Sequence, residues 1–507
     1  MKGKYKEKSK DKVRNEALKY GIETLTVGRT ESTIARRSYV RDIKGCLLEK
    51  GSVSDKAYAR ELLDTEILHW ESFYDSIVGR RSPAELRVAY LSGPNPENDM
   101  EVLIQHGILP ENIWAFESDN ATYTEAIISA LDSKFPFLKI YKGKIQNYLK
   151  ILPFKFDIIY LDFCKTIASD QTLSVVRDVF QFQKLSSPGV LITNFSYPDN
   201  EDYRKNLNML SANYLYPKVF TEEYDDMGGG YVESPECTGI ELQDFIQLNI
   251  DKGDTFYSQF ITRVLYDLPG ALIPYQRLAS NSELVKLFFK NFNKDSFSED
   301  YLEDLMCFPG DNSLIWGLSN YIIDDPEFKK FQGKFNKQLS LTSDENKLIE
   351  QIELVHYFIS EGLKSSLHSD GLEKIRQGWR IDKTYLFCDV FLFHQLKDIL
   401  IGQLTSPYFY NVDKTNRWWY KAKETEMFMD LITYDECRYV FDWMPTLDMF
   451  EHGVNNLNRQ LSLRFAMDSI TKQRRWYNEE FFSGTAVVDQ GEKTFEAKEL
   501  AKRIRIK

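Results

Sequence analysis

Short apolar segments decide the fold, and they read LRVAYL at residues 86–91, IWAF at 113–116, FDIIYL at 156–161 and GVLITNF at 189–195. Each has the length of a strand, and we expect one more strand at 138–141. Apolar residues three and four positions apart predict intervening helices at 98–106, 122–131 and 173–182. Strands that alternate with helices in this way predict right-handed βαβ units in a mainly parallel sheet, which is an α/β fold.

The length of the chain predicts more than one domain. Its 507 residues exceed the roughly 250–300 that one hydrophobic core usually holds. We expect a basic flexible lead at 1–20, a helical N-terminal segment at 21–85, an α/β domain at 86–265 with an acidic insertion at 198–254, and a mostly helical C-terminal domain at 270–507. Helical patterns on which this division rests occur at 55–78, 282–289, 298–306 and 342–363.

Composition predicts a folded, water-soluble protein. Hydrophobic residues make up 43% of the chain, charged residues 28%, and the net charge is -12. An acidic total argues against indiscriminate coating of nucleic acid. Both ends are nevertheless basic, and their simplest interpretation is solvated, frayed tails.

The cysteines bear on location and on metal binding. The six cysteines are scattered without a CxxC pair. This spacing argues against both a zinc site and a disulfide framework. No apolar run follows the basic start, and none is long enough to span a bilayer. We therefore expect a cytoplasmic protein that does not bind membranes.

Polar residues follow the expected strands at the edge of the sheet where ligands bind. In an open parallel sheet this edge is formed by the carboxyl ends of the strands. Gly93 and Asn95 follow the first strand, Glu117 the second, Lys144 the third and Asp162 the fourth. A glycine allows close approach of a ligand to the backbone, and a carboxylate at the position of Glu117 can accept both hydroxyls of a ribose.

This order resembles the class I S-adenosylmethionine (SAM) methyltransferases over residues 86–195. The resemblance implies a Rossmann-like sheet and SAM as the cofactor. It implies that the loop of Gly93 and Asn95 holds the methionine part, that Glu117 binds the ribose, and that Lys144 occupies the adenine position. Asp162 would then stand in the motif that faces the substrate.

Three residues after the fourth strand are candidates for catalysis. Asp162 is placed to orient or deprotonate the acceptor. Cys164 stands where cytosine-C5 methyltransferases carry a nucleophile, although Phe163 precedes it in place of their proline, and a small structural side chain is the simpler interpretation. Lys165 is a candidate to lower the pKa of that thiol or to hold a phosphate, the alternative being a surface lysine.

Clusters of arginine and tryptophan suggest the class of substrate. An arginine can neutralise phosphate while an aromatic face stacks on a base, and the alternative is a core or interface anchor. The residues concerned are Arg376, Trp379, Arg417, Trp418, Arg475 and Trp476.

The sequence therefore predicts a SAM-dependent methyltransferase that acts on nucleic acid. Two alternatives remain open. The loop has one glycine where the family usually has two or three, which fits a catalytically degenerate scaffold or recognition subunit that docks protein partners through the C-terminal domain. In the other alternative the sheet binds a different nucleotide and the protein is a hydrolase or transferase, although the chain has no phosphate-binding GKS/T loop.

Overall fold

A computed structural model describes residues 8–198, 200–216, 239–248, 253–274, 402–403, 405–445, 456–474 and 500–506. The helices expected at 282–289, 298–306 and 342–363 lie outside these residues. Among the described residues, no helix combines the length and apolar character that crossing a membrane requires.

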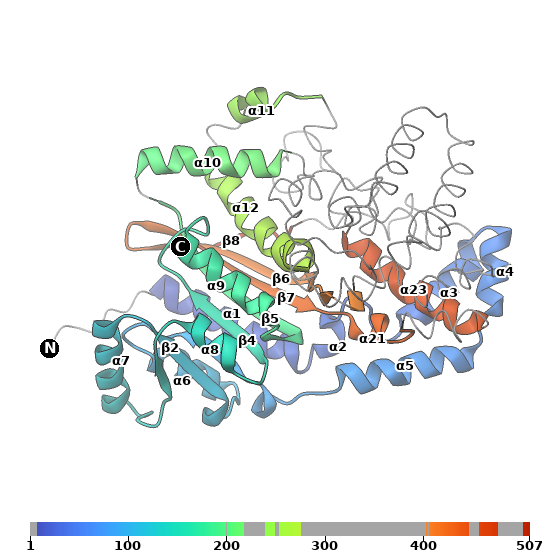
Figure 1. The fold of residues 1–507 in the computed structure, drawn as a ribbon, viewed down its shortest axis with the longest axis horizontal. Coiled ribbons are helices and arrows are strands. Elements are labelled where there is room, and N and C mark those ends of the chain that lie inside the picture. The colour runs from blue at the N-terminus through green and yellow to red at the C-terminus, as the bar shows by residue number, and fades with distance from the viewer. Residues whose placement is uncertain are drawn as a thin grey trace, which may run out of the picture.

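One eight-stranded sheet organises the molecule (Figure 1). Its strands are β1 (Val88–Leu91), β2 (Ile113–Glu117), β3 (Ile140–Lys142), β4 (Phe156–Asp162), β5 (Leu185–Ser196), β6 (Phe409–Ala422), β7 (Thr425–Asp435) and β8 (Ile504–Ile506). Their spatial order is β3-β2-β1-β4-β5-β7-β6-β8.

The first five strands pair in parallel, as the sequence predicts. Ala89 of β1 lies between Trp114 of β2 and Ile159 of β4. The order β3-β2-β1-β4-β5 has the switch point of Rossmann-type sheets, since the chain moves outward from β1 first to one side and then to the other. Strand β7 runs antiparallel to both β5 and β6. The predicted Rossmann-like α/β fold is thus confirmed.

The apolar strands are buried on both faces. Val88 and Tyr90 belong to the core on the α1 side of the sheet, whereas Ala89 between them belongs to the opposite core. The same alternation holds along β4, where Ile158 and Ile159 enter different cores. Because side chains alternate across a strand and both faces are covered, nearly every position must be apolar.

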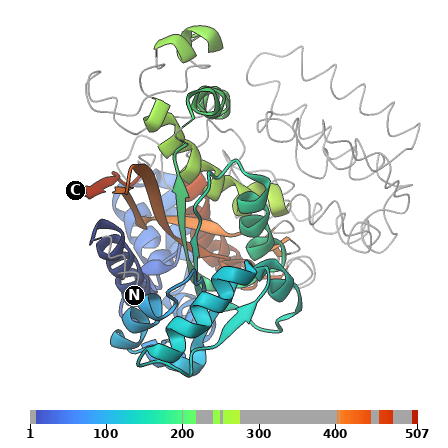
Figure 2. The same cartoon turned by 90° about the vertical axis from the view of Figure 1, so that its left-hand side faces the viewer.

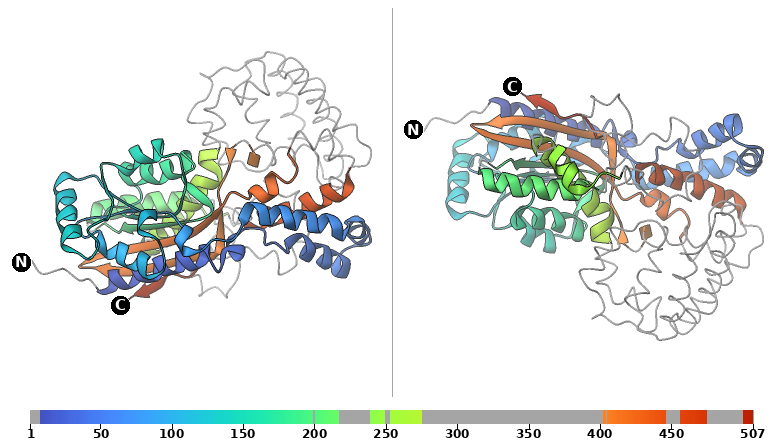
Figure 3. Two further views of the ribbon diagram at one scale, coloured as in Figure 1. Left: turned by 90° about the horizontal axis from the view of Figure 1, so that it is seen from below. Right: turned by 90° about the horizontal axis from the view of Figure 1, so that it is seen from above.

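Helices cover the two faces as separate layers (Figure 3). One layer contains α1 (Lys8–Leu25) and α6 (Glu97–Gln105), and the other contains α8 (Ile145–Ile151), α9 (Asp170–Gln181) and α12 (Gly253–Asp267). Helix α7 (Asn120–Asp132) lies beside β2 and β3. Helix α10 (Glu201–Leu215) packs on α12 and also contacts α11 (Leu242–Leu248), so these helices build outward from the sheet (Figure 2).

The expectation of a flexible lead at 1–20 is wrong for residues 8–20. They form most of α1, which buries Val13, Ala17, Leu18, Ile22 and Leu25 against the sheet. Successive members of this set are one, three or four residues apart, which places them on one face of the helix, while the lysines lie on its other faces. The high lysine content of this segment conceals that stripe in the sequence.

The helix expected at 55–78 is two helices. Helix α4 (Val53–Glu61) is capped by Ser52, whose hydroxyl accepts a hydrogen bond from the Asp55 N–H. The backbone is extended at Leu62 and Leu63, and α5 (Asp64–Val78) follows. Gly79 ends α5 with a φ of +60°, a conformation that glycine adopts at little cost.

A second core lies at the end of the molecule away from α6 and α7 (Figure 1). It is formed by helices from both ends of the chain, namely α3 (Tyr39–Lys50), α4, α5, α21 (Arg438–Phe441) and α23 (Leu457–Arg474). Short helices at Arg29–Ser32 (α2), Pro83–Glu85 (η1), Pro110–Asn112 (η2) and Leu268–Leu272 (η5) complete the described elements.

The expected boundary at residue 270 does not separate two domains, because β6, β7 and β8 belong to the same sheet as β1–β5. The basic C-terminus is also not a frayed tail. Arg503, which precedes β8, donates to the buried Asp430 carboxylate over 2.6 Å, and the Arg417 Nε lies 4.0 Å from that group. A charged residue can enter the core here because it meets an opposite charge there.

Candidate functional site

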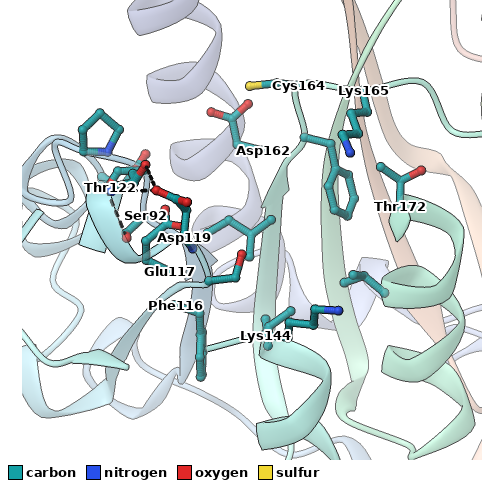
Figure 4. Close-up of a pocket in the computed structure, with 18 of the residues that line it drawn as sticks. Ser92, Phe116, Glu117, Asp119, Thr122, Lys144, Asp162, Cys164, Lys165 and Thr172 are labelled. Carbon is teal, nitrogen blue, oxygen red and sulfur yellow. Dashed lines mark hydrogen bonds between the residues drawn. The ribbon is translucent and has the colours of Figure 1, made fainter. Parts of the chain in front are cut away.

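A cavity of about 1180 Å³ opens at the carboxyl ends of the parallel strands (Figure 4). Its walls are the turns after β1, β2, β3 and β4, the start of α9 and one face of α1. The switch in strand order predicts a ligand at this place, because the connections after β1 and after β4 lead to opposite sides of the sheet and leave a crevice between them.

Gly93 leaves the turn after β1 open to the cavity. Its φ is +57°, and a Cβ added there would have no atom within 4 Å. Pro94 and Asn95 line the cavity and are exposed. Pro96 lies outside the lining, is buried, and accepts a hydrogen bond from the Tyr90 hydroxyl at its carbonyl. The prolines therefore shape this turn without filling it.

Glu117 ends β2 and faces the same cavity (Figure 4). Its Oε1 accepts a hydrogen bond of 2.8 Å from the Asp119 N–H, which holds the half-buried carboxylate at the wall. Asp119 in turn caps α7, and hydrogen bonds from Thr122 lower the pKa of its carboxyl group. On the neighbouring strand, the Gly143 N–H donates to the Glu117 carbonyl, which fixes the turn that leads to Lys144. Lys144 is exposed and also lines the cavity.

Both carboxylate oxygens of Asp162 have partners. Asn194 Nδ2 donates to Oδ1 over 2.7 Å, and Lys10 Nζ lies 2.7 Å from Oδ2. Desolvation is the largest single effect and would lower the pKa of Lys10, but the charge and hydrogen bond of Asp162, together with smaller contributions from Cys164 and Asp99, raise it overall. A carboxylate held in this way is a hydrogen-bond acceptor of fixed direction rather than a free base.

Cys164 and Lys165 stand at the edge of the cavity beside Asp162 (Figure 4). Desolvation, followed by the neighbouring Asp162 charge, raises the pKa of the Cys164 thiol. Because the thiolate is the nucleophilic form, this environment does not activate the thiol. Lys165 donates to the side chain of Gln171 at the start of α9, so its ammonium points along the rim.

Sequence reasoning missed the contribution of α1 and α6 to the site. Lys10, Asp11 and Arg14 reach the cavity from α1, and Asp99 reaches it from the first turn of α6. Lys10 and Arg14 are four residues apart, which places them on one face of a helix. Once the segment is recognised as helical, that spacing is the signal that identifies them.

Asp99 is a buried carboxylate with one close cation. Arg14 Nε lies 3.4 Å from Asp99 Oδ1, and that oxygen has no hydrogen-bond partner in the part of the chain that the structure describes. Burial raises the pKa of Asp99 to about 7, although Arg14 opposes this shift. An acid that titrates near neutrality in a cavity wall is a candidate functional group.

One of the predicted clusters of arginine and tryptophan lies in the core. Arg417 and Trp418 are 0% and 3% exposed, and Arg417 donates to the Ser258 carbonyl within the core. Their burial contradicts the predicted contact with nucleic acid. Arg376, Trp379, Arg475 and Trp476 lie outside the described residues. Within the described residues, no three metal-ligating side chains converge.

Comparison with known proteins finds similarity only to solved structures; no protein-family model matches the chain, and no curated protein matches it. One of these solved structures is a SAM-dependent methyltransferase from Agrobacterium tumefaciens. It is 15% identical to this chain, with a TM-score of 0.19, and the match covers 28% of this chain and 47% of the methyltransferase. A probable spermidine synthase from Corynebacterium glutamicum has 17% identity, a TM-score of 0.20, and coverage of 30% and 56%. A SAM-dependent methyltransferase from Clostridium acetobutylicum has 20% identity, a TM-score of 0.19, and coverage of 36% and 65%.

The chain thus spans about half to two thirds of the length of these proteins. Since each similarity is partial, we assign the fold from the strand order and register of the sheet and not from these matches.

We predict that replacing Asp99 with Asn changes how stability depends on pH. The folded-state pKa of about 7 exceeds the roughly 3.9 of an unfolded Asp. The contribution of protonated Asp99 is therefore fully present below about pH 4 and is lost as the pH rises through about 7. Asp99→Asn should raise Tm relative to the wild type at about pH 8, and the difference should shrink toward about pH 5.

The comparison requires thermal unfolding of both proteins across that range, with the exposed Asp132→Asn as control. The charged groups that act on Asp99 are Arg14, Asp162, Lys10 and Asp11, and all remain in the variant. A Tm difference between Asp99→Asn and the wild type that is independent of pH would contradict the assignment.

Proposed function

We propose that this protein is a SAM-dependent methyltransferase. The observation that carries the proposal is the joint placement of Gly93 and Glu117 on one cavity, at the ends of the adjacent strands β1 and β2. The turn at Gly93 offers an open backbone surface, and Glu117 offers a carboxylate one strand away. The ribose of an adenosyl group presents two neighbouring hydroxyls, which a carboxylate can accept. The open backbone at Gly93 leaves room for the rest of the cofactor beside that carboxylate.

The size of the cavity fits a cofactor together with an acceptor. Small-molecule sites usually enclose roughly 300–1,000 Å³, and this cavity reaches about 1180 Å³. The residues that would hold the cofactor are Gly93, Asn95, Glu117 and Lys144, which line the β1, β2 and β3 side. Asp162, Cys164 and Lys165 line the β4 side, which we assign to the acceptor.

When bound, SAM supplies an electrophilic methyl group on a sulfonium. The chain contributes alignment, since holding two reactants in the right geometry supplies much of the rate gain of such transfers. Asn194 and Lys10 hold Asp162 from two sides. We infer that Asp162 accepts a hydrogen bond from the acceptor and orients it. The surroundings of Cys164 raise the pKa of its thiol and so do not activate it as a nucleophile.

We propose nucleic acid as the substrate. The support comes from two exposed lysines that line the cavity away from the residues assigned to the cofactor, namely Lys165 after β4 and Lys423 in the β6–β7 turn. Cations at the mouth of a cavity attract a phosphate backbone and release its counterions.

A non-catalytic scaffold is the second candidate. The ion pair between Lys10 and Asp162 favours it, because that pair occupies the carboxylate assigned to the acceptor. Such a protein would bind ligand in the cavity without turnover.

Replacing Glu117 with Ala should abolish binding of S-adenosylhomocysteine, the product form of the cofactor. A ligand at one hundred times its Kd stabilises a protein by about 2.7 kcal/mol, so wild-type Tm should rise by several degrees with the ligand, whereas the Glu117→Ala Tm should not. Glu125→Ala, on the exposed face of α7, is the matched control and should respond like the wild type. A wild-type Tm that rises with ATP or NAD but not with S-adenosylhomocysteine would refute the proposal.

Replacing Lys165 and Lys423 together with Gln should weaken binding of single-stranded RNA or DNA. Removing two phosphate contacts should reduce the slope of log K against log salt by about 1.4, since each contact contributes about 0.7 on a single strand. Fluorescence anisotropy at several salt concentrations measures this slope, with Lys12→Gln on the exposed face of α1 as control. An unchanged slope would remove nucleic acid as the proposed substrate at this rim.

A further inference from the structure

The position of Asp99 is costly and calls for an explanation. Its side chain is 9% exposed, and a buried charge is stable only where partners compensate its desolvation. A carboxylate in the first turn of a helix ordinarily accepts a hydrogen bond from a nearby backbone N–H. Asp99 Oδ1 accepts none from the described residues, so Asp99 does not act as an ordinary helix cap through this oxygen.

Arg14 places a cation directly beside this anion. Its Nε lies 3.4 Å from Asp99 Oδ1, and its Nη2 donates to Asp11 over 2.7 Å. Arg14 Nε, like the Asp99 oxygen, has no hydrogen-bond partner among the described residues. The wall therefore presents a positive and a negative group side by side, and their pairing leaves hydrogen-bonding capacity unused.

The other cation of this face is already engaged. Lys10 Nζ lies 2.7 Å from Asp162 Oδ2, whereas Arg14 faces Asp99 in the first turn of α6. Both cations are fixed by the docking of α1, which buries Val13 and Ala17 on the sheet. The positions of Arg14 and Asp99 beside the turn at Gly93 are thus fixed by the packing of α1 and α6.

We propose that Arg14 and Asp99 bind the α-amino-acid group of the cofactor, with Arg14 on its carboxylate and Asp99 on its ammonium. This inference rests on the proposed function and assigns one end of the cofactor. An α-amino-acid group carries an ammonium and a carboxylate on the same carbon atom, which complements a neighbouring carboxylate and guanidinium. The ammonium supplies hydrogen-bond donors to Asp99, and the guanidinium recognises a carboxylate through its fork of N–H groups.

Calorimetry with two ligands tests this assignment. S-adenosylhomocysteine contains the amino-acid group, and 5′-methylthioadenosine has the same nucleoside and thioether without it. Asp99→Asn and Arg14→Gln should each weaken binding of S-adenosylhomocysteine roughly ten- to a hundredfold, the range for a lost hydrogen bond to a charged group. Binding of 5′-methylthioadenosine should stay within about twofold of the wild type.

Matched variants separate this role from a structural one. Lys12→Gln on α1 and Glu101→Gln on α6 lie outside the lining of the cavity and should bind both ligands like the wild type. Arg14→Lys keeps the cation and should recover part of the affinity for S-adenosylhomocysteine. Thermal unfolding of each variant shows that it is folded at the temperature of the titration.

The outcomes distinguish this inference from the proposed function. If the wild type binds both ligands through Glu117 but Asp99→Asn and Arg14→Gln bind S-adenosylhomocysteine normally, the amino-acid assignment is wrong and the proposed function stands. Equal losses for both ligands in these two variants also overturn it. If the wild type binds neither ligand, the proposed function fails, and this assignment fails with it.

Discussion

The parallel register of β1 with β2 and β4 is the constraint on which the site depends. Ala89 lies level with Trp114 on one side and with Ile159 on the other. Because the three strands run in the same direction, their carboxyl ends bring Gly93, Glu117 and Asp162 to one edge of the sheet. The backbone pairing that stabilises the core thereby also forms the cavity.

Helix α1 adds a charged wall to this edge of the sheet. Its apolar face is buried on the sheet, and its polar face carries Lys10 to Asp162 and Arg14 to Asp99. The burial of Asp99 has an electrostatic cost, because it raises the pKa of that carboxyl group to about 7 although Arg14 acts in the opposite direction. Proteins often retain such costs at sites where a ligand supplies the missing partner. The N-terminal segment is therefore part of the site rather than an appendage to it.

The residues on the first five strands and their turns were predictable, because a doubly covered strand must be apolar and the residue that follows it must lie at the ligand edge. Gly93 and Glu117 were found in this way. Strand β6 was missed because it contains polar and charged residues such as Arg417, whose burial depends on Asp430 in the neighbouring strand. Asp99 was missed because its environment depends on α1, a segment distant in sequence whose lysines conceal its apolar face. Periodicity reports local structure, whereas these features arise from tertiary contacts.

A crystal structure with S-adenosylhomocysteine tests the central claim most directly, namely that the turns after β1 and β2 form an adenosyl site. We predict density for the nucleoside against the backbone at Gly93, with both ribose hydroxyls within hydrogen-bond distance of Glu117. A ligand bound elsewhere, or a cavity without ligand density at a saturating concentration, would contradict the account.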